Sequence, residues 1–162
     1  MTDYKRPVME LIAHNISNFS EQHPQNKCLV THSELDWYFA QDDSFLKSLE
    51  VLDHNMDPTQ GTFHDFALKT DVIIGSDLLY FPDSVQPLFE MVFKLFEISE
   101  NKDLVFYMCM IKRGKEIHDA LDSYILENQN RMSFKVTDQE FISKAAEEFK
   151  GQGCTLYEIR KV

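Results

Sequence analysis

The chain has 162 residues, of which 43% are hydrophobic and 27% charged, and its formal net charge is −11. This length and composition suit a soluble globular chain with its own core, and we expect residues 1–162 to form a single domain. The acidic charge argues against a nucleic-acid partner, whose backbone is bound by Lys and Arg, and favours a basic protein, a cationic side chain or a small molecule.

The first half of the chain gives the weaker structural signals. Apolar residues at helical spacing follow Pro7 and predict a helix over residues 5–19. A short apolar run favours a strand at 28–32, and residues 45–49 suggest a short helix. The segment Asp-Pro-Thr-Gln-Gly at 57–61 is typical of a turn.

From residue 71 onward, strands and helices are expected to alternate. The sequence predicts a strand at 71–76, a helix at 84–98 with Asp83 as its N-cap, and a buried strand at 104–111. The later elements are a helix opened by Gly114, a strand at 132–136, a helix from Thr137 to residue 150 and a last strand at 155–162. This order favours an α/β fold with a doubly wound, mostly parallel sheet and an antiparallel C-terminal strand.

One stretch, "GSDLLYFPDSV" at 75–85, places an acidic side chain where a buried strand should end. Ligands of open α/β sheets bind at that edge. There the Asp77 carboxylate could hold a cationic ammonium group, and Tyr80 could line a channel or make a hydrogen bond. The alternative is a loop carboxylate and a packed tyrosine, which the tetrapeptide alone favours.

Two further residues follow expected strands. Asp3 precedes the first helix and could accept hydrogen bonds from ribose hydroxyls, or could simply cap that helix. Trp37, the single tryptophan, lies just after the strand at 28–32 and could cover an adenine ring or anchor the core edge. Both interpretations stay open for each residue.

The cysteines argue against a secreted, disulfide-bonded or metal-binding chain. Cys28, Cys109 and Cys154 are odd in number and far apart, which favours a reducing compartment, the cytoplasm or the nucleus. Neither the cysteines nor the six histidines show metal-ligand spacing, so no metal is expected. The longest apolar run, Leu104 to Ile111, is too short to cross a bilayer, and we expect no membrane partner.

Together these signals resemble the class I, seven-β-strand S-adenosylmethionine-dependent methyltransferases, most closely the methyltransferase-like protein-lysine methyltransferase family. The family pattern has "TD" ending strand two, "L-x-W" after strand three, and a "D-hydrophobic-I-hydrophobic-x-S/A-D-hydrophobic-hydrophobic-Y-x-P" motif across strand four. This sequence has Thr2-Asp3, Leu35-Asp36-Trp37 and "DVIIGSDLLYFP" from Asp71 to Pro82. The resemblance implies a Rossmann-like methyltransferase fold that spans nearly the whole chain.

The resemblance also implies roles for the residues in these motifs. Asp3 would hold the ribose of S-adenosylmethionine, Trp37 would lie beside the adenine, and Ser76 would lie near the cofactor. Asp77 and Tyr80 would face the acceptor amine. The implied function is methylation of a lysine side chain of a protein. The alternatives are a catalytically inactive subunit that binds a protein partner and a small-molecule N-methyltransferase.

The sequence departs from the family pattern in one respect. A first strand and a glycine-rich loop precede "TD" in the family, whereas no glycine precedes Gly61 here. We therefore expect this partial domain to bind S-adenosylmethionine weakly or not at all by itself, which leaves its activity uncertain. The absent strand would leave the strand at 71–76 with an unpaired edge, so we expect the chain to pair with a second chain, dimerise or aggregate.

Overall fold

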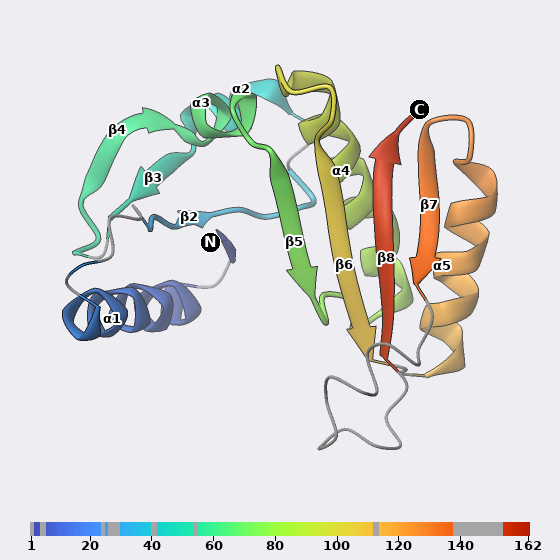
Figure 1. Cartoon of the computed structure of the whole chain (residues 1–162), viewed down its shortest axis with the longest axis horizontal. Coiled ribbons are helices and arrows are strands. Elements are labelled where there is room, and N and C mark those ends of the chain that lie inside the picture. The colour runs from blue at the N-terminus through green and yellow to red at the C-terminus, as the bar shows by residue number, and fades with distance from the viewer. Residues whose placement is uncertain are drawn as a thin grey trace. The chain divides into compact units, whose positions relative to one another are not determined.

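The computed structural model describes residues 2–3, 6–23, 25, 30–39, 42–53, 55–111, 114–137 and 154–162. Contacts within the chain define two compact units, Met1–Leu68 and Lys69–Val162. We call them unit 1 and unit 2 and describe each by itself (Figure 1). None of the helices in the described part of the chain has the length and apolar character needed to cross a membrane.

The described residues of unit 1 form two small sheets and three helices. Its elements are β1 (Thr2–Asp3), α1 (Arg6–Gln22), β2 (Ser33–Glu34), α2 (Asp43–Ser48), β3 (Glu50–Leu52), β4 (Pro58–Thr62) and α3 (Phe63–Leu68). Strands β1 and β2 pair in parallel, whereas β3 and β4 form an antiparallel pair. The expected helices at 5–19 and 45–49 are confirmed as α1 and α2.

The face of α1 that is buried follows directly from the sequence. Met9, Ala13 and Ile16 lie four and three residues apart and are all at most 5% exposed. The strand expected at 28–32 falls partly on residues 26–29, which lie outside the described residues. In the described part, His32 forms a bridge with Leu52 through two backbone hydrogen bonds of 3.0 and 2.8 Å, and β2 follows.

His32 is a buried polar side chain in unit 1. It is 1% exposed, and its Nε2 lies 3.1 Å from the sulfur of Met56. Its Nδ1 has no hydrogen-bond partner among the described residues. Burial lowers the pKa of His32 below its ordinary value, because the imidazolium form would lose its hydration.

The turn expected at 57–61 is wrong, since Pro58–Thr62 is strand β4. The chain reverses earlier, where the Asp53 carboxylate accepts hydrogen bonds from the backbone N–H of Asn55 (2.7 Å) and Asp57 (3.1 Å). These side-chain hydrogen bonds stabilise a turn at residues 53–57, ahead of Pro58 and Gly61, the residues on which the expected turn was based. Pro58 opens the strand, a position at which its missing N–H is tolerated.

In unit 2, the part of the chain that the structure describes forms a four-stranded sheet with helices. Its elements are β5 (Val72–Ser76), η1 (Pro82–Ser84), α4 (Val85–Ile98), β6 (Val105–Ile111), α5 (Lys115–Glu127), β7 (Met132–Thr137) and β8 (Cys154–Lys161). The strand order is β5-β6-β8-β7 (Figure 1). All four expected strands are confirmed, and so are two of the three expected helices, the one at 84–98 and the one opened by Gly114. The expected helix at 137–150 lies outside the described residues beyond Thr137.

The α/β class is confirmed, but the expectation of a mostly parallel sheet is wrong, because the sheet of unit 2 is mixed. Strand β6 runs parallel to β5 and antiparallel to β8, and β8 runs antiparallel to β7. Strands β6 and β7 therefore point the same way, and β8 is inserted between them in the opposite direction. The expected antiparallel C-terminal strand is thus present, inside the sheet rather than at its edge.

The core of unit 2 lies between the sheet and α4. Alternate residues of β6, namely Phe106, Met108 and Met110, are at most 1% exposed. The buried residues of α4 are Val85, Leu88, Phe89, Met91, Val92, Leu95 and Phe96. So many apolar positions in 14 residues explain why the helix could be predicted from the sequence.

The N-cap expected at Asp83 is wrong. A short 3-10 helix, η1, precedes α4, and Ser84 occupies the N-cap position without a side-chain capping bond. The Ser84 hydroxyl instead donates to the carbonyl of Phe81 at 2.6 Å. Pro82 favours this tight first turn because its φ is already helical.

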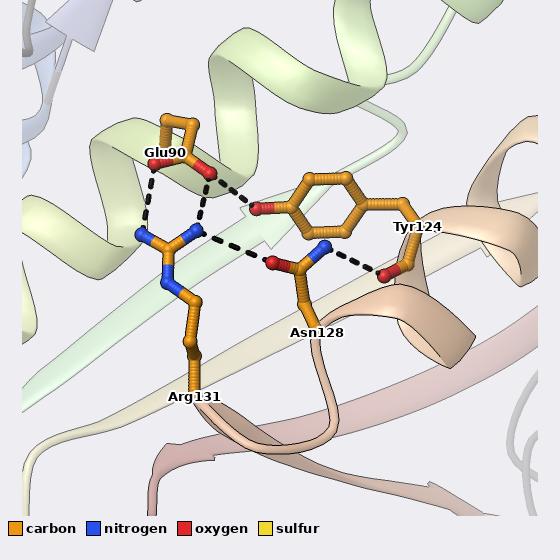
Figure 2. A network of polar contacts seen from close by, with 4 residues as sticks. All are labelled: Glu90, Tyr124, Asn128 and Arg131. Carbon is orange, nitrogen blue, oxygen red and sulfur yellow. Dashed lines mark hydrogen bonds and ion pairs between the residues drawn. The ribbon is translucent and has the colours of Figure 1, made fainter.

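A polar network joins α4 to the end of α5 (Figure 2). The Arg131 guanidinium donates to both carboxylate oxygens of Glu90, at 2.6 and 2.9 Å. The Tyr124 hydroxyl donates to the same carboxylate at 2.9 Å. Asn128 accepts a third bond from Arg131 at 3.2 Å and donates to the Tyr124 carbonyl at 2.9 Å. The network therefore fixes the turn that leads from α5 into β7.

The network sets the protonation of its members. The hydrogen bonds from Arg131 lower the pKa of Glu90 below its ordinary value, with a smaller contribution from Tyr124. Burial, together with the negative Glu90 carboxylate, raises the pKa of Tyr124, so the phenol stays protonated. The guanidinium also lies 3.8 Å from the centroid of the Phe93 ring.

We expect Glu90→Gln to lower the free energy of unfolding of the chain by about 1–2 kcal/mol near neutral pH, because the bidentate ion pair is only partly exposed. A carboxyl whose pKa is lowered on folding stabilises the fold above its unfolded pKa of about 4.5. The difference between wild type and variant should therefore shrink as the pH falls through the lowered pKa of Glu90. Urea unfolding followed by circular dichroism measures it.

Glu100→Gln is the control, since Glu100 is an exposed carboxylate just beyond α4. It should leave stability unchanged. Equal losses for the two variants, or a Glu90→Gln loss that persists at low pH, would contradict a specific role for the ion pair.

Candidate functional site

The candidate acceptor site of unit 2 is built where β5 ends. Ser76 is the last residue of the strand, is exposed and pairs with Cys109 of β6. The next residue, Asp77, still donates its backbone N–H to the Cys109 carbonyl at 2.7 Å. Its φ of 53° lies in the left-handed region, which Asp tolerates better than most residues. The chain therefore turns sharply at Asp77 after one last bond to β6.

Two residues after Asp77 hold the loop against the sheet. Leu79 is fully buried. Leu78 folds back closely over Gly75. A Cβ added at residue 75 would lie only 2.5 Å from Leu78 Cδ1 and 3.0 Å from Phe106 Cε2. Glycine at position 75 thus makes room for the loop that follows the strand.

This loop brings Asp77 and Tyr80 together. The Tyr80 hydroxyl lies 3.5 Å from Asp77 Oδ2, a long hydrogen bond. Tyr80 is 54% exposed and Phe81 is 70% exposed, whereas the Asp77 side chain is half-buried. A carboxylate beside two aromatic side chains can attract a cation through charge and through the faces of the rings.

Unit 1 positions two of the three expected cofactor residues. Asp3 is the last residue of β1 and pairs with Glu34, the last residue of the parallel strand β2. Trp37 lies three residues beyond Glu34, in a turn where the Asp36 carboxylate accepts from the Tyr38 N–H at 2.9 Å. Asp3 and the Trp37 turn therefore both follow the carboxyl ends of one pair of parallel strands.

Trp37 is half-buried, which leaves part of the indole surface accessible. The side chain of Asp3 lies outside the described residues. Asp3 and Trp37 belong to unit 1, whereas Ser76, Asp77 and Tyr80 belong to unit 2. The structure thus brings the candidate residues together as two groups, one in each unit.

Two contributors to the unit 2 site were not found from the sequence. The backbone carbonyl of Cys109 holds the Asp77 N–H, and no local pattern indicates a bond between residues on different strands. The exposed ring of Phe81 was also missed, although its position between Tyr80 and Pro82 was a usable signal. Within the described ranges, no group of three or more His, Cys, Asp or Glu side chains could hold a metal ion.

No protein-family model matches the sequence, and no curated protein matches it either.

The left-handed conformation at Asp77 predicts how substitutions there affect stability. Asp77→Val should lower the free energy of unfolding by about 1–2 kcal/mol relative to Asp77→Gly, because a β-branched side chain is strained at positive φ and glycine is not. Both variants lose the carboxylate, so their difference isolates the backbone term. Thermal and urea unfolding of the two variants measure it.

Ser76→Val is the matched control, because the same side chain is placed one residue earlier on an exposed strand position. It should be neutral or slightly stabilising. Equal stability of Asp77→Val and Asp77→Gly would show that the backbone at residue 77 is not left-handed in solution.

Proposed function

We propose that this chain is a Rossmann-like, S-adenosylmethionine-dependent methyltransferase-family protein whose complete form methylates a lysine side chain of a protein. The observation that carries the proposal is the pairing of Asp77 and Tyr80 at the carboxyl end of a parallel strand, with their oxygen atoms 3.5 Å apart. The strand order β5-β6-β8-β7 supports it, since the C-terminal strand runs antiparallel to its neighbours, as the order of elements in the sequence predicted.

The residues present suit the proposed cofactor. Ligands of α/β sheets bind beyond the carboxyl ends of parallel strands, and Asp3, Trp37 and Ser76 all lie at or just after such ends. In this proposal the Asp3 carboxylate accepts from the ribose hydroxyls and the accessible part of Trp37 stacks on the adenine, both within unit 1. The bound cofactor would supply a methyl group activated by its positively charged sulfur.

The chain's own part in the reaction is to select and orient the acceptor. The Asp77 carboxylate attracts a lysine ammonium, and the Tyr80 hydroxyl offers a second polar contact beside it. The attacking amine must be neutral, so the lysine nitrogen would first give a proton to solvent. Its lone pair would then form the N–C bond to the methyl carbon while the S–C bond of the donor breaks and its sulfur leaves as a neutral thioether. Because alignment of donor and acceptor is the main requirement, the rigid attachment of Asp77 to β6 is useful in itself.

A second candidate is a catalytically inactive subunit of the same fold that binds a protein partner. The exposed apolar side chains of Val72 (47%) and Ile74 (79%) favour it, because apolar surface left uncovered by the described residues suits a protein partner. A small-molecule N-methyltransferase is a third, weaker candidate on the same site. We propose the cytoplasm or the nucleus as the compartment.

Methyl transfer by the purified chain tests the main proposal. The donor is S-adenosylmethionine with a labelled methyl group at millimolar concentration, the acceptor is heat-treated total cell protein, and the product is methyl-lysine after hydrolysis. Asp77→Asn should lower the rate about 100-fold, because it removes the charge with little change in shape. Asp83→Asn, which changes an exposed carboxylate six residues later, should leave the rate unchanged.

Equal activity of Asp77→Asn and wild type would remove the acceptor-side role of Asp77. No methyl-lysine from wild-type protein to which S-adenosylmethionine is shown to bind would favour the inactive subunit. Labelling of a mixture of small amines, supplied in place of the protein acceptor, with no labelling of protein would favour the third candidate.

Residues 1–60 contain no glycine, which leads to a separate prediction about cofactor binding by these 162 residues. We expect the 162-residue chain by itself to bind S-adenosylmethionine weakly, with a Kd of roughly 1 mM or above, or not at all. Calorimetric titration measures this affinity. Stacking of adenine on Trp37 should also quench the fluorescence of this single tryptophan, and Trp37→Phe is the variant without that signal. Tight binding would show that another segment of the chain forms the turn that holds the cofactor.

A further inference from the structure

The backbone turn at Asp77 is held in two ways. The Asp77 N–H donates to the Cys109 carbonyl at 2.7 Å, which ties residue 77 to β6. The next residue, Leu78, carries its side chain back over Gly75 in β5. The position of the Asp77 backbone therefore depends on one hydrogen bond into the sheet and on the apolar contact of the residue that follows it.

The contact of Leu78 with Gly75 leaves no room for a larger residue at position 75. A Cβ added there would lie 2.5 Å from Leu78 Cδ1, whereas carbon atoms that are not bonded to each other pack at about 3.5–4.0 Å. The backbone itself does not require glycine there, since Gly61 is the only glycine in the described ranges with a positive φ. The space that a side chain at residue 75 would fill is occupied by Leu78 instead.

The Phe106 ring forms a second wall of this space. Its Cε2 and Cζ atoms would lie 3.0 and 3.2 Å from a Cβ at residue 75. Phe106 is 1% exposed, and its register partners are Ile73 of β5 and Ile159 of β8. A ring enclosed in this way has little space to move, so a clash at residue 75 would be relieved by Leu78, which is only half-buried.

Any displacement of Leu78 affects the adjacent Asp77. A shift that restores a normal contact would move Leu78 Cδ1 by about 1 Å. A leucine that left this space by rotating its side chain would give up its contact with Gly75, so the turn would lose its apolar anchor in either case. Site residues have to be held within about 0.5 Å of the productive geometry, and a misplacement of about 1 Å can lower a rate about 100-fold.

We propose that Leu78 is a positioning residue of the acceptor side, and that residue 75 has to be glycine because Leu78 occupies the space above it. Seated over Gly75 and beside the Phe106 ring, Leu78 fixes where the turn places the Asp77 carboxylate. The effect of Leu78 on methyl transfer rests on the proposed function, whereas its effect on the turn does not.

Hydrogen exchange at the Asp77 amide tests the turn and requires no catalytic activity. It is measured in NMR spectra of the full chain, with the amides of β8 as internal reference, because exchange through global unfolding would rise there too. Gly75→Ala should raise the exchange rate at Asp77 about tenfold or more and leave β8 unchanged. Gly114→Ala is the matched control, since a Cβ at residue 114 would meet no atom within 4 Å. It should leave exchange at Asp77 unchanged.

Truncation of Leu78 shows whether the clash is the cause. Leu78→Ala alone should also raise exchange at Asp77, because the turn loses its apolar contact. The double variant Gly75→Ala/Leu78→Ala should exchange no faster than Leu78→Ala, because the added methyl group then has room. If Gly75→Ala by itself fails to fold, recovery of the fold in the double variant is the same rescue.

Methyl transfer connects the turn with the proposed reaction. In the assay given for the proposed function, Gly75→Ala should lower the rate about 10- to 100-fold. The KM for S-adenosylmethionine should stay within about twofold of the wild-type value, because the displaced carboxylate faces the acceptor. If wild-type protein transfers no methyl group, the proposed function fails, and the exchange measurements decide the role of Leu78 in the turn.

Three results would overturn the proposal. The first is unchanged protection of the Asp77 amide in Gly75→Ala or in Leu78→Ala. The second is faster exchange in the double variant than in Leu78→Ala, because alanine at residue 75 would then be harmful without Leu78. The third is a normal rate of methyl transfer by a Gly75→Ala chain whose Asp77 amide has lost its protection.

Discussion

The hydrogen bond from the Asp77 N–H to the Cys109 carbonyl is the constraint on which the unit 2 site depends. At 2.7 Å it continues the parallel ladder of β5 and β6 one step past Ser76, the last strand residue. The left-handed φ of Asp77 then turns the chain away. Because β6 is held in the core, the backbone that carries the Asp77 carboxylate is held as firmly as the sheet itself.

On the side of α4 and α5, the core against which β6 packs is covered by apolar and polar contacts that share the same residues. The Tyr124 ring stacks on Phe89 at a centroid distance of 5.0 Å, while its hydroxyl bonds the Glu90 carboxylate. Phe89 in turn meets the edge of Phe134 on β7. Helices α4 and α5 and strand β7 are therefore joined by one group of residues, and the ion pair with Arg131 is placed where it reinforces the packing.

Local apolar patterns were enough to predict most elements of unit 2, because buried apolar residues recur along β6 at strand spacing and along α4 at helical spacing. The strand order could not be predicted from local patterns, because the insertion of β8 between β6 and β7 depends on pairing between residues far apart in the sequence. The error at 57–61 has a local cause, because the Asp53 carboxylate makes the turn earlier than the proline and glycine suggest.

The same distinction applies to the site. The position of Asp77 at a strand end followed from the apolar run before it, and the run was read correctly as β5. Its left-handed backbone did not follow, because Asp adopts that conformation only where the surroundings favour it. The bond between Glu90 and Arg131, 41 residues apart, has no local signal at all.

The sequence of β5 is more apolar than its burial among the described residues would require. A continuous apolar run such as Val72-Ile73-Ile74 is typical of a strand covered on both faces, not of one with a solvated face. Among the described residues, Ile73 faces the core while Val72 and Ile74 stay largely exposed. Side chains of a strand stand perpendicular to the sheet, so Val72 and Ile74 lie on a face that the described residues leave largely uncovered, and they gain little stability from burial there. The pairing of β5 with β6, by contrast, accounts for the geometry of Asp77.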